Sequence, residues 1–175
     1  FDAPQTVERN LLNETVTLYY LSPSKYAFSI KSGFDYLLNY QLDNIYKLKL
    51  HPNTRMTADF QTTYYIRQFR YAPLTSQIKW KPSSMFDTNI NANYDLNNGE
   101  FQTINHNINW TTSASWENKW IFSAYFTANP SLNQPYQLQT LSATKDLHRR
   151  QLTLMYNRIL EEFRFQFSIN AVPDN

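Results

Sequence analysis

Asp87, Asn89 and Asn91 have the spacing of the oxygen ligands that open a calcium-binding loop. Such a loop also needs glycine at its sixth position and glutamate at its twelfth, where this chain has Ala92 and Asn98. Residues spaced by two also share one face of a β-strand, because successive side chains of a strand point to opposite faces. We therefore interpret the run as the polar side of a strand and expect no metal site.

The histidines and the adjacent acidic residues do not form a catalytic pattern. His51, His106 and His148 are far apart, and none has a second ligand at a spacing typical of zinc sites. We expect each of them to be an interfacial or turn residue. A strand would point Glu161 and Glu162 to opposite faces, which does not suit the paired carboxylates of a glycosidase. No cofactor and no enzymatic activity are predicted.

Several basic residues are candidates for contact with lipid phosphates at the boundary of a membrane. Long basic side chains at such a boundary also extend their charged ends into water without binding a particular lipid, and we prefer this simpler interpretation. The residues are Arg67, Arg70, Lys79, Lys81, Arg149 and Arg150.

The segment from Glu162 to Asn170 alternates between polar and apolar residues, which predicts a β-strand with one apolar side. Its apolar residues are Phe163, Phe165, Phe167 and Ile169. Similar segments recur along the chain, and we predict eleven strands of about the length that crosses a membrane when tilted. They span roughly residues 13–21, 25–36, 42–51, 54–66, 73–81, 85–96, 100–111, 118–127, 136–145, 149–158 and 161–170.

The composition favours an antiparallel transmembrane β-barrel over a soluble β-sandwich. Of the 175 residues, 17% are aromatic and 17% are charged, against a usual charged share of about 25%. Only two residues are glycine, so the turns must rely on Asn, Pro, Asp and Ser. No apolar run approaches the ~18 residues of a membrane-spanning helix. The net charge of +2 is too small and scattered for a nucleic-acid surface, and the absence of cysteine excludes disulfides.

One face of the predicted barrel is rich in amides and hydroxyls, which suits a water-filled lumen. The residues expected to line the lumen are Asp87, Asn89, Asn91, Asn93, Asn105, Asn107 and Asn109. The opposite face would contact lipid, with aromatic residues forming interfacial girdles at the strand ends. The candidates for these girdles are Tyr19, Tyr20, Tyr64, Tyr65, Trp80, Trp110 and Trp120.

The connections alternate between tight turns near proline and longer loops, which are expected to face the periplasm and the outside respectively. We expect a two-residue hairpin turn at Asn98-Gly99. Bacterial barrels have an even number of strands, so an odd count predicts that further barrel strands precede this chain. The tight turns are expected near residues 23–24, 52–53, 82–84 and 146–148, and the longer loops at 37–41, 67–72 and 128–135.

Two stretches resemble the C-terminal barrel of the LptD (OstA) family, the lipopolysaccharide-assembly translocon of the outer membrane. The first runs from Trp80-Lys81-Pro82 to Phe101 and matches a turn with Trp and Pro, a strand closing on Tyr94-Asp95-Leu96, and a Gly turn. The aromatic-Asp pair recurs at Phe34-Asp35, and we interpret it as an interfacial aromatic residue beside a loop-capping Asp.

The second stretch contains Asp146, Leu147 and His148 and is similar to a Lys-Asp-Leu-His-Cys-Trp element near the end of that family's barrel. This chain departs from the element at Arg149 and Arg150, where Cys and Trp would be expected. The likeness covers roughly residues 13–170, although only these two stretches are specific.

The resemblance implies that residues 1–175 are part of one transmembrane β-barrel domain, with upstream strands and a periplasmic domain outside this chain. It implies a passive conduit for lipopolysaccharide in the outer membrane of a Gram-negative-type bacterium. The strand with Phe163, Phe165, Phe167 and Ile169 would carry the assembly signal and form one side of a lateral seam. The implied partners are lipopolysaccharide, a lumen-plugging lipoprotein, periplasmic transport-bridge proteins and the barrel-assembly machinery. A generic porin or adhesin barrel, a barrel lipase and a soluble sandwich are the alternatives.

Overall fold

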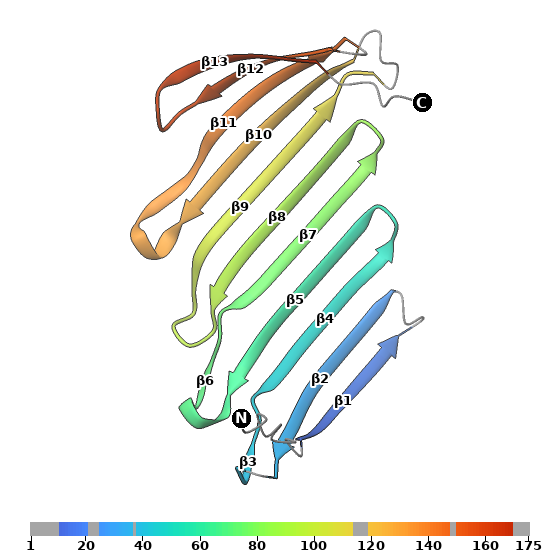
Figure 1. Ribbon diagram of the computed structural model, residues 1–175, viewed down its shortest axis with the longest axis vertical. Coiled ribbons are helices and arrows are strands. Elements are labelled where there is room, and N and C mark those ends of the chain that lie inside the picture. Colours follow the sequence, from blue (N-terminus) through green and yellow to red (C-terminus); the bar gives the residue numbers. More distant parts are fainter. Residues whose placement is uncertain (1–10, 21–24, 37, 114–118, 148–149, 170–175) are drawn as a thin grey trace, which may run out of the picture.

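The computed structural model describes residues 11–20, 25–36, 38–113, 119–147 and 150–169. They form one antiparallel β-sheet, which Figure 1 shows as a single twisted layer. Its long strands are β1 (Leu11–Tyr20), β2 (Tyr26–Asp35), β4 (Asn44–Asn53), β5 (Met56–Tyr65), β7 (Leu74–Ser83), β8 (Phe86–Asp95), β9 (Glu100–Thr111), β10 (Trp120–Asn129), β11 (Gln134–Asp146), β12 (Arg150–Asn157) and β13 (Glu162–Ile169). The shorter elements are the strands β3 (Tyr40–Gln41) and β6 (Arg70–Tyr71) and the 3-10 turns η1 (Ile66–Gln68) and η3 (Pro130–Leu132). No helix within these ranges is long and apolar enough to cross a membrane.

Each long strand pairs with the long strands before and after it, in the order β1-β2-β4-β5-β7-β8-β9-β10-β11-β12-β13. The predicted all-β antiparallel fold with eleven long strands is confirmed, and every predicted strand boundary lies within two residues of the observed one. β1 and β13 are the two edges of the sheet, and neither has a second neighbour in the described part of the chain.

The strand registers decide which side chains share a face, because directly paired residues of antiparallel strands point the same way. Ser123 pairs with Asn109 and Ser142, whereas Phe122 pairs with Trp110 and Ala143. Most residues from β2 to β13 separate in the same way. The exceptions include Ser76 and Lys145 on the apolar face and Ile45 and Met155 on the polar face. The sheet therefore has one polar and one apolar face, as the alternation predicted.

The sheet has almost no interior of its own. Ala58 and Ala128 are the only buried hydrophobic residues in the described part of the chain. The accessible surface is 12984 Å², whereas a compact protein of 20.8 kDa would expose roughly 9,000 Å². Many large hydrophobic side chains are exposed as a result. Removing them from water requires contact with lipid or with further protein, which the described residues do not provide.

The five loops at one end of the sheet, on the left in Figure 1, share one construction. Each has four residues, and the fourth has a positive φ; these residues are Asn39, Phe69, Gly99, Asn133 and Glu161. Gly99 (φ 75°) therefore ends a four-residue loop, and the predicted two-residue turn at Asn98-Gly99 is wrong. Four of the loops follow an Asp or Asn whose side-chain oxygen accepts a hydrogen bond from the loop, as short polar side chains do in turns.

The opposite end, on the right in Figure 1, has two-residue turns at Thr54-Arg55 and Ser84-Met85. Pro52 and Pro82 lie in bulges of the preceding strands, where a missing N–H does not interrupt the ladder. Eight residues, 112–119, separate β9 from β10, more than in any of the five loops. The tight turns predicted near 52–53 and 82–84 and the longer loops predicted at 37–41, 67–72 and 128–135 are therefore found at opposite ends of the sheet, as expected, and the connection 112–119 is the exception to the division.

Candidate functional site

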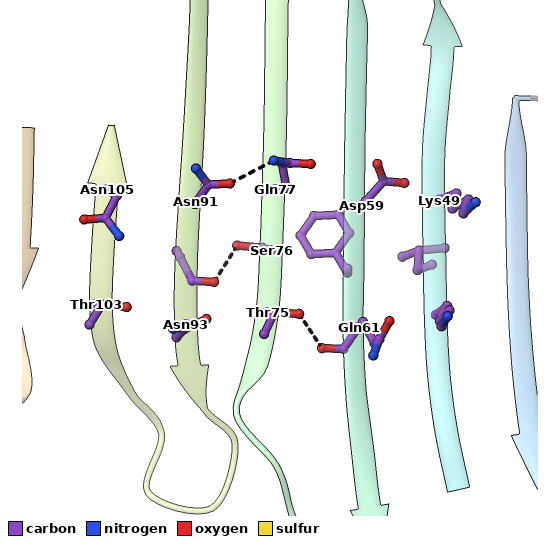
Figure 2. Close-up of a pocket in the computed structure, with 14 residues that line it drawn as sticks. Lys49, Asp59, Gln61, Thr75, Ser76, Gln77, Asn91, Asn93, Thr103 and Asn105 are labelled. Atoms are coloured by element: carbon purple, nitrogen blue, oxygen red, sulfur yellow. Dashed lines mark hydrogen bonds between the residues drawn. The ribbon is translucent and has the colours of Figure 1, made fainter. Parts of the chain in front are cut away.

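The polar face brings the predicted lumen residues together. Register pairing across β8 and β9 places all seven of them on one face: Asp87, Asn89, Asn91, Asn93, Asn105, Asn107 and Asn109. Hydrogen bonds connect neighbouring amides along this face. The Gln77 side-chain amide donates to the Asn91 oxygen at 3.1 Å, as Figure 2 shows, and the Asn109 amide donates to Asp87 at 2.9 Å.

A cleft of about 390 Å³ lies on the polar face between β4 and β9 (Figure 2). Lys47 and Lys49 line the β4 side, and the amides of Asn91, Asn93 and Asn105 line the β8–β9 side. The volume lies in the range of small-molecule sites, about 300–1,000 Å³. Asp59 also lines the cleft, so its lining combines two cations and one carboxylate with amides that both donate and accept hydrogen bonds.

The apolar face has an aromatic row at each end. At the loop end each hairpin carries one pair of rings with centroids 4.9–5.2 Å apart: Phe34–Tyr36, Tyr64–Tyr71, Tyr94–Phe101, Phe126–Tyr136 and Tyr156–Phe163. At the turn end the rings form the pairs Trp80–Phe86, Trp110–Phe122 and Trp120–Phe122. Between these rows the face is more aliphatic, with Ile78, Ile90 and Ile108 on neighbouring strands. Aromatic residues with an apolar body and a polar edge suit such a boundary.

The predicted girdle residues are only partly placed as expected. Tyr64, Trp80, Trp110 and Trp120 lie in these rows. Tyr65 pairs with Arg70 and so faces the polar side. Tyr19 and Tyr20 pair with β2, but their side chains lie outside the described part of the structure.

A hydrogen-bonded polar cluster around His106 lies within the apolar face. His106 shares a hydrogen bond of 2.7 Å between Nε2 and the Thr88 hydroxyl, and its Nδ1 is bonded to the Tyr136 hydroxyl. Thr88 gives its only proton to the Asn107 carbonyl, so His106 Nε2 donates to Thr88. In the neutral imidazole Nδ1 then accepts from the Tyr136 hydroxyl, and both ring nitrogens are paired. His106 lies within β9 and so is not a turn residue, whereas its expected interfacial position stays a prediction. His51 lies near a turn, bonded to Asp59 at 2.8 Å, and His148 lies outside the described residues.

The terminal strand exposes its whole apolar side. Phe163, Phe165, Phe167 and Ile169 are 72%, 70%, 51% and 69% exposed. They pair with β12 across one ladder, while the other edge of β13 has no partner among the described residues. The predicted pairing of the last two segments is confirmed.

The motif residues occupy strand ends. Tyr94 contacts the Phe101 ring, and Asp95 accepts hydrogen bonds from the backbone N–H groups of Asn97 (2.8 Å) and Asn98 (3.3 Å). The Asn97 N–H in particular holds the pKa of the Asp95 carboxyl below its usual range. Leu96 is the first residue of this loop. The interpretation of the repeated Asp as a loop cap is confirmed, since the buried Asp35 likewise accepts from the Leu38 N–H at 2.9 Å.

The second motif closes the turn between β11 and β12. Asp146 ends β11, and the Leu147 N–H donates to the Arg150 carbonyl at 2.8 Å; His148 and Arg149 lie outside the described residues. Within the described ranges, no three His, Cys, Asp or Glu side chains are placed to hold a metal ion. Comparison of the chain with models of protein families, with curated proteins and with solved structures finds no match.

Proposed function

We propose that this chain forms part of a transmembrane β-barrel that conducts lipopolysaccharide to the outer leaflet of the bacterial outer membrane. The observation that carries the proposal is the continuous polar face backed by an apolar face with aromatic rows at both ends. A membrane barrel requires this combination: lipid outside, water inside and aromatic residues at both interfaces.

The height of the apolar band supports a membrane environment. Phe86 and Tyr94 mark its two ends on β8 and are eight residues apart. At ~3.4 Å per residue they are separated by about 27 Å along the strand, or about 20 Å along the membrane normal at the ~40° tilt of outer-membrane barrels. The expected band is about 25 Å tall. Asp95 and the four-residue loops then lie beyond the band, in the interfacial region.

The two free edges support membership in a larger barrel. An unpaired edge in a membrane leaves backbone groups unsatisfied, so β1 and β13 require further strands or each other. We place residues 1–175 in one barrel domain with additional upstream strands and a periplasmic domain, as the resemblance to the LptD family implies.

Transport of lipopolysaccharide rests on the two motif stretches and on the exposed terminal strand. In this proposal the polar face lines the lumen, and β13 forms one side of a seam through which lipid leaves. Lipopolysaccharide, a plugging lipoprotein, transport-bridge proteins and the assembly machinery are the proposed partners, and the chain performs no chemical step. A porin or adhesin barrel shares both faces but needs no opening seam.

A tether across the seam tests the proposal. These 175 residues contain no cysteine, so in a full-length protein whose remaining cysteines have been replaced, a cysteine at Gln166 and another on the facing upstream strand give one defined disulfide. We expect the oxidised protein to remain folded and to stop delivering lipopolysaccharide to the cell surface, with delivery restored by reduction. Normal surface lipopolysaccharide with the seam fully cross-linked would instead support a porin or adhesin.

A further inference from the structure

The apolar face carries very few charges, and the registers place them together. In the described parts of strands β2 to β13, the only charged residues on this face are Lys145 of β11 and Arg150 of β12. Lys145 pairs with Trp120 and Leu152, and Arg150 pairs with Ile169. Both cations lie at the turn end of their strands, which is at the upper right in Figure 1.

The two cations are close enough to hold one anion. Leu152 is directly opposite Lys145, and Arg150 is two residues beyond Leu152 on the same face, so Lys145 and Arg150 are diagonal neighbours. Diagonal neighbours on a sheet lie about 7–8 Å apart, within the reach of two long side chains. A guanidinium can bind two phosphate oxygens in parallel, and an ammonium adds a compact positive charge. The pair therefore suits a phosphate group.

No carboxylate accompanies these cations on the apolar face in the described part of β10 to β13. Asp146 and Glu162 pair with Gln151 and Asn157, which places both carboxylates on the polar face. Arg150 is exposed and forms no ion pair with a described residue. Two like charges at this distance repel each other, and an anion from the surroundings would offset the repulsion.

The side chains next to the cations provide an apolar surface. Leu154, Phe165 and Phe167 are exposed and extend from the cations towards the middle of the face along β12 and β13. On the other side, the Lys145 Nζ atom lies 5.5 Å from the centre of the Trp120 ring. Tryptophan is enriched at the level of lipid headgroups. A phosphate held by the cations would thus place attached acyl chains over exposed apolar side chains.

From this arrangement we infer that Lys145 and Arg150 bind the phosphate of an anionic glycerophospholipid, whose acyl chains lie over β12 and β13. The inference rests on the proposed membrane barrel and adds a lipid other than the cargo. The turn end is expected to face the periplasm, whereas lipopolysaccharide would be delivered to the opposite leaflet. If Arg150 only extended its charge into water, the face would have no preference for an anionic headgroup.

Native mass spectrometry of the full-length protein in detergent tests the inference with dioleoyl phosphatidylglycerol and the zwitterionic dioleoyl phosphatidylcholine. We expect the first molecule of phosphatidylglycerol to bind at least tenfold more tightly than the first molecule of phosphatidylcholine. Soluble glycerophosphoglycerol, which has the same headgroup without acyl chains, should compete at least tenfold more weakly than the intact anionic lipid.

The possible failures are distinguishable. Equal affinity for the two lipids would overturn this inference but not the barrel proposal, whereas failure of both lipids to bind would contradict both. Competition by glycerophosphoglycerol as strong as that by the intact lipid would indicate a site for free anions and would also overturn the inference.

Substitutions locate the site. Arg150→Gln should weaken phosphatidylglycerol about fivefold, as for one exposed ion pair, and leave phosphatidylcholine unchanged. Arg150→Lys should lose less, because it keeps the charge but not the paired contacts. The double variant Lys145→Gln/Arg150→Gln should bind the two lipids equally. Lys79→Gln removes the same charge from the polar face towards the turn end and should change neither lipid. An equal loss in Lys79→Gln and Lys145→Gln would contradict the assignment.

Discussion

Ile90→Arg measures the cost of a charge at the centre of the apolar face. Ile90 is four residues from Phe86 and four from Tyr94, and it pairs with Ile78 and His106. Arginine at the midplane of an outer-membrane barrel costs about 2–4 kcal/mol, and ~3 kcal/mol corresponds to roughly a 150-fold change in the folding equilibrium. Asn91→Arg places the same charge on the polar face and should cost less than ~1 kcal/mol, as in a hydrated lumen.

The assay is urea unfolding of the full-length protein in lipid vesicles, with the slope of the transition compared between variants. Ile90→Met keeps a long side chain without charge and separates size from charge. Phe122→Arg should give an intermediate penalty, because Phe122 lies in the aromatic row at the turn end, where the cost of charge falls. A penalty for Asn91→Arg equal to that of Ile90→Arg would refute the assignment of faces.

Three further predictions address particular elements. Tyr136→Phe removes the donor to His106 and leaves a ring nitrogen unpaired on an apolar face, so it should destabilise by about 1–3 kcal/mol; in a His106→Leu background the same change should cost much less, as a double-mutant cycle would show. Gly99→Ala should cost about 1–2 kcal/mol through its left-handed conformation alone, since the nearest atom to the added carbon is 3.8 Å away; an unchanged unfolding midpoint would be inconsistent with the observed φ. Phe165→Asp on the apolar side of β13 should reduce the amount of heat-modifiable, folded protein in the outer membrane, whereas normal assembly would argue against a lipid-facing stripe.

The strands and their faces could be predicted because both follow from one local property, the alternation of side chains. Asn91 and Phe122 each lie on the face that their strand pattern indicated. The long, regular segments left few alternatives for the register, since a shift by one residue would exchange the two faces.

The loops and bulges were not predictable in the same way. Phe69 and Glu161 adopt positive φ although neither is Gly or Asn, so residue type gave no signal there. Gln139 is the extra, buried residue of a bulge between Leu138 and Thr140. The bulge arises from the pairing of β11 with β10, and the sequence of β11 alone contains no sign of it. The one local signal that would have found most of the loops is the Asp or Asn that ends the preceding strand.

The pairing of His106 with Tyr136 depends on residues 30 positions apart. The alternation placed His106 on the apolar side, but the hydrogen-bond partners that make this placement tolerable become visible only with the register of β8, β9, β10 and β11. Lys49 and Lys79 are 30 positions apart and share the polar face only through the pairing of β5 with β4 and β7, so their proximity could not be predicted from the sequence either.

The most direct test of the central claim is a scan of spin labels along β8. These 175 residues contain no cysteine, so in a full-length protein whose remaining cysteines have been replaced, residues 87–94 can each be labelled alone after insertion into vesicles. The account predicts that accessibility to lipid-soluble oxygen and to a water-soluble nickel complex alternates with a period of two, with oxygen highest at Ile90 and nickel higher at Asn91. A profile without alternation, or with nickel highest at Ile90, would contradict the proposal that the apolar face contacts lipid and the polar face lines a lumen.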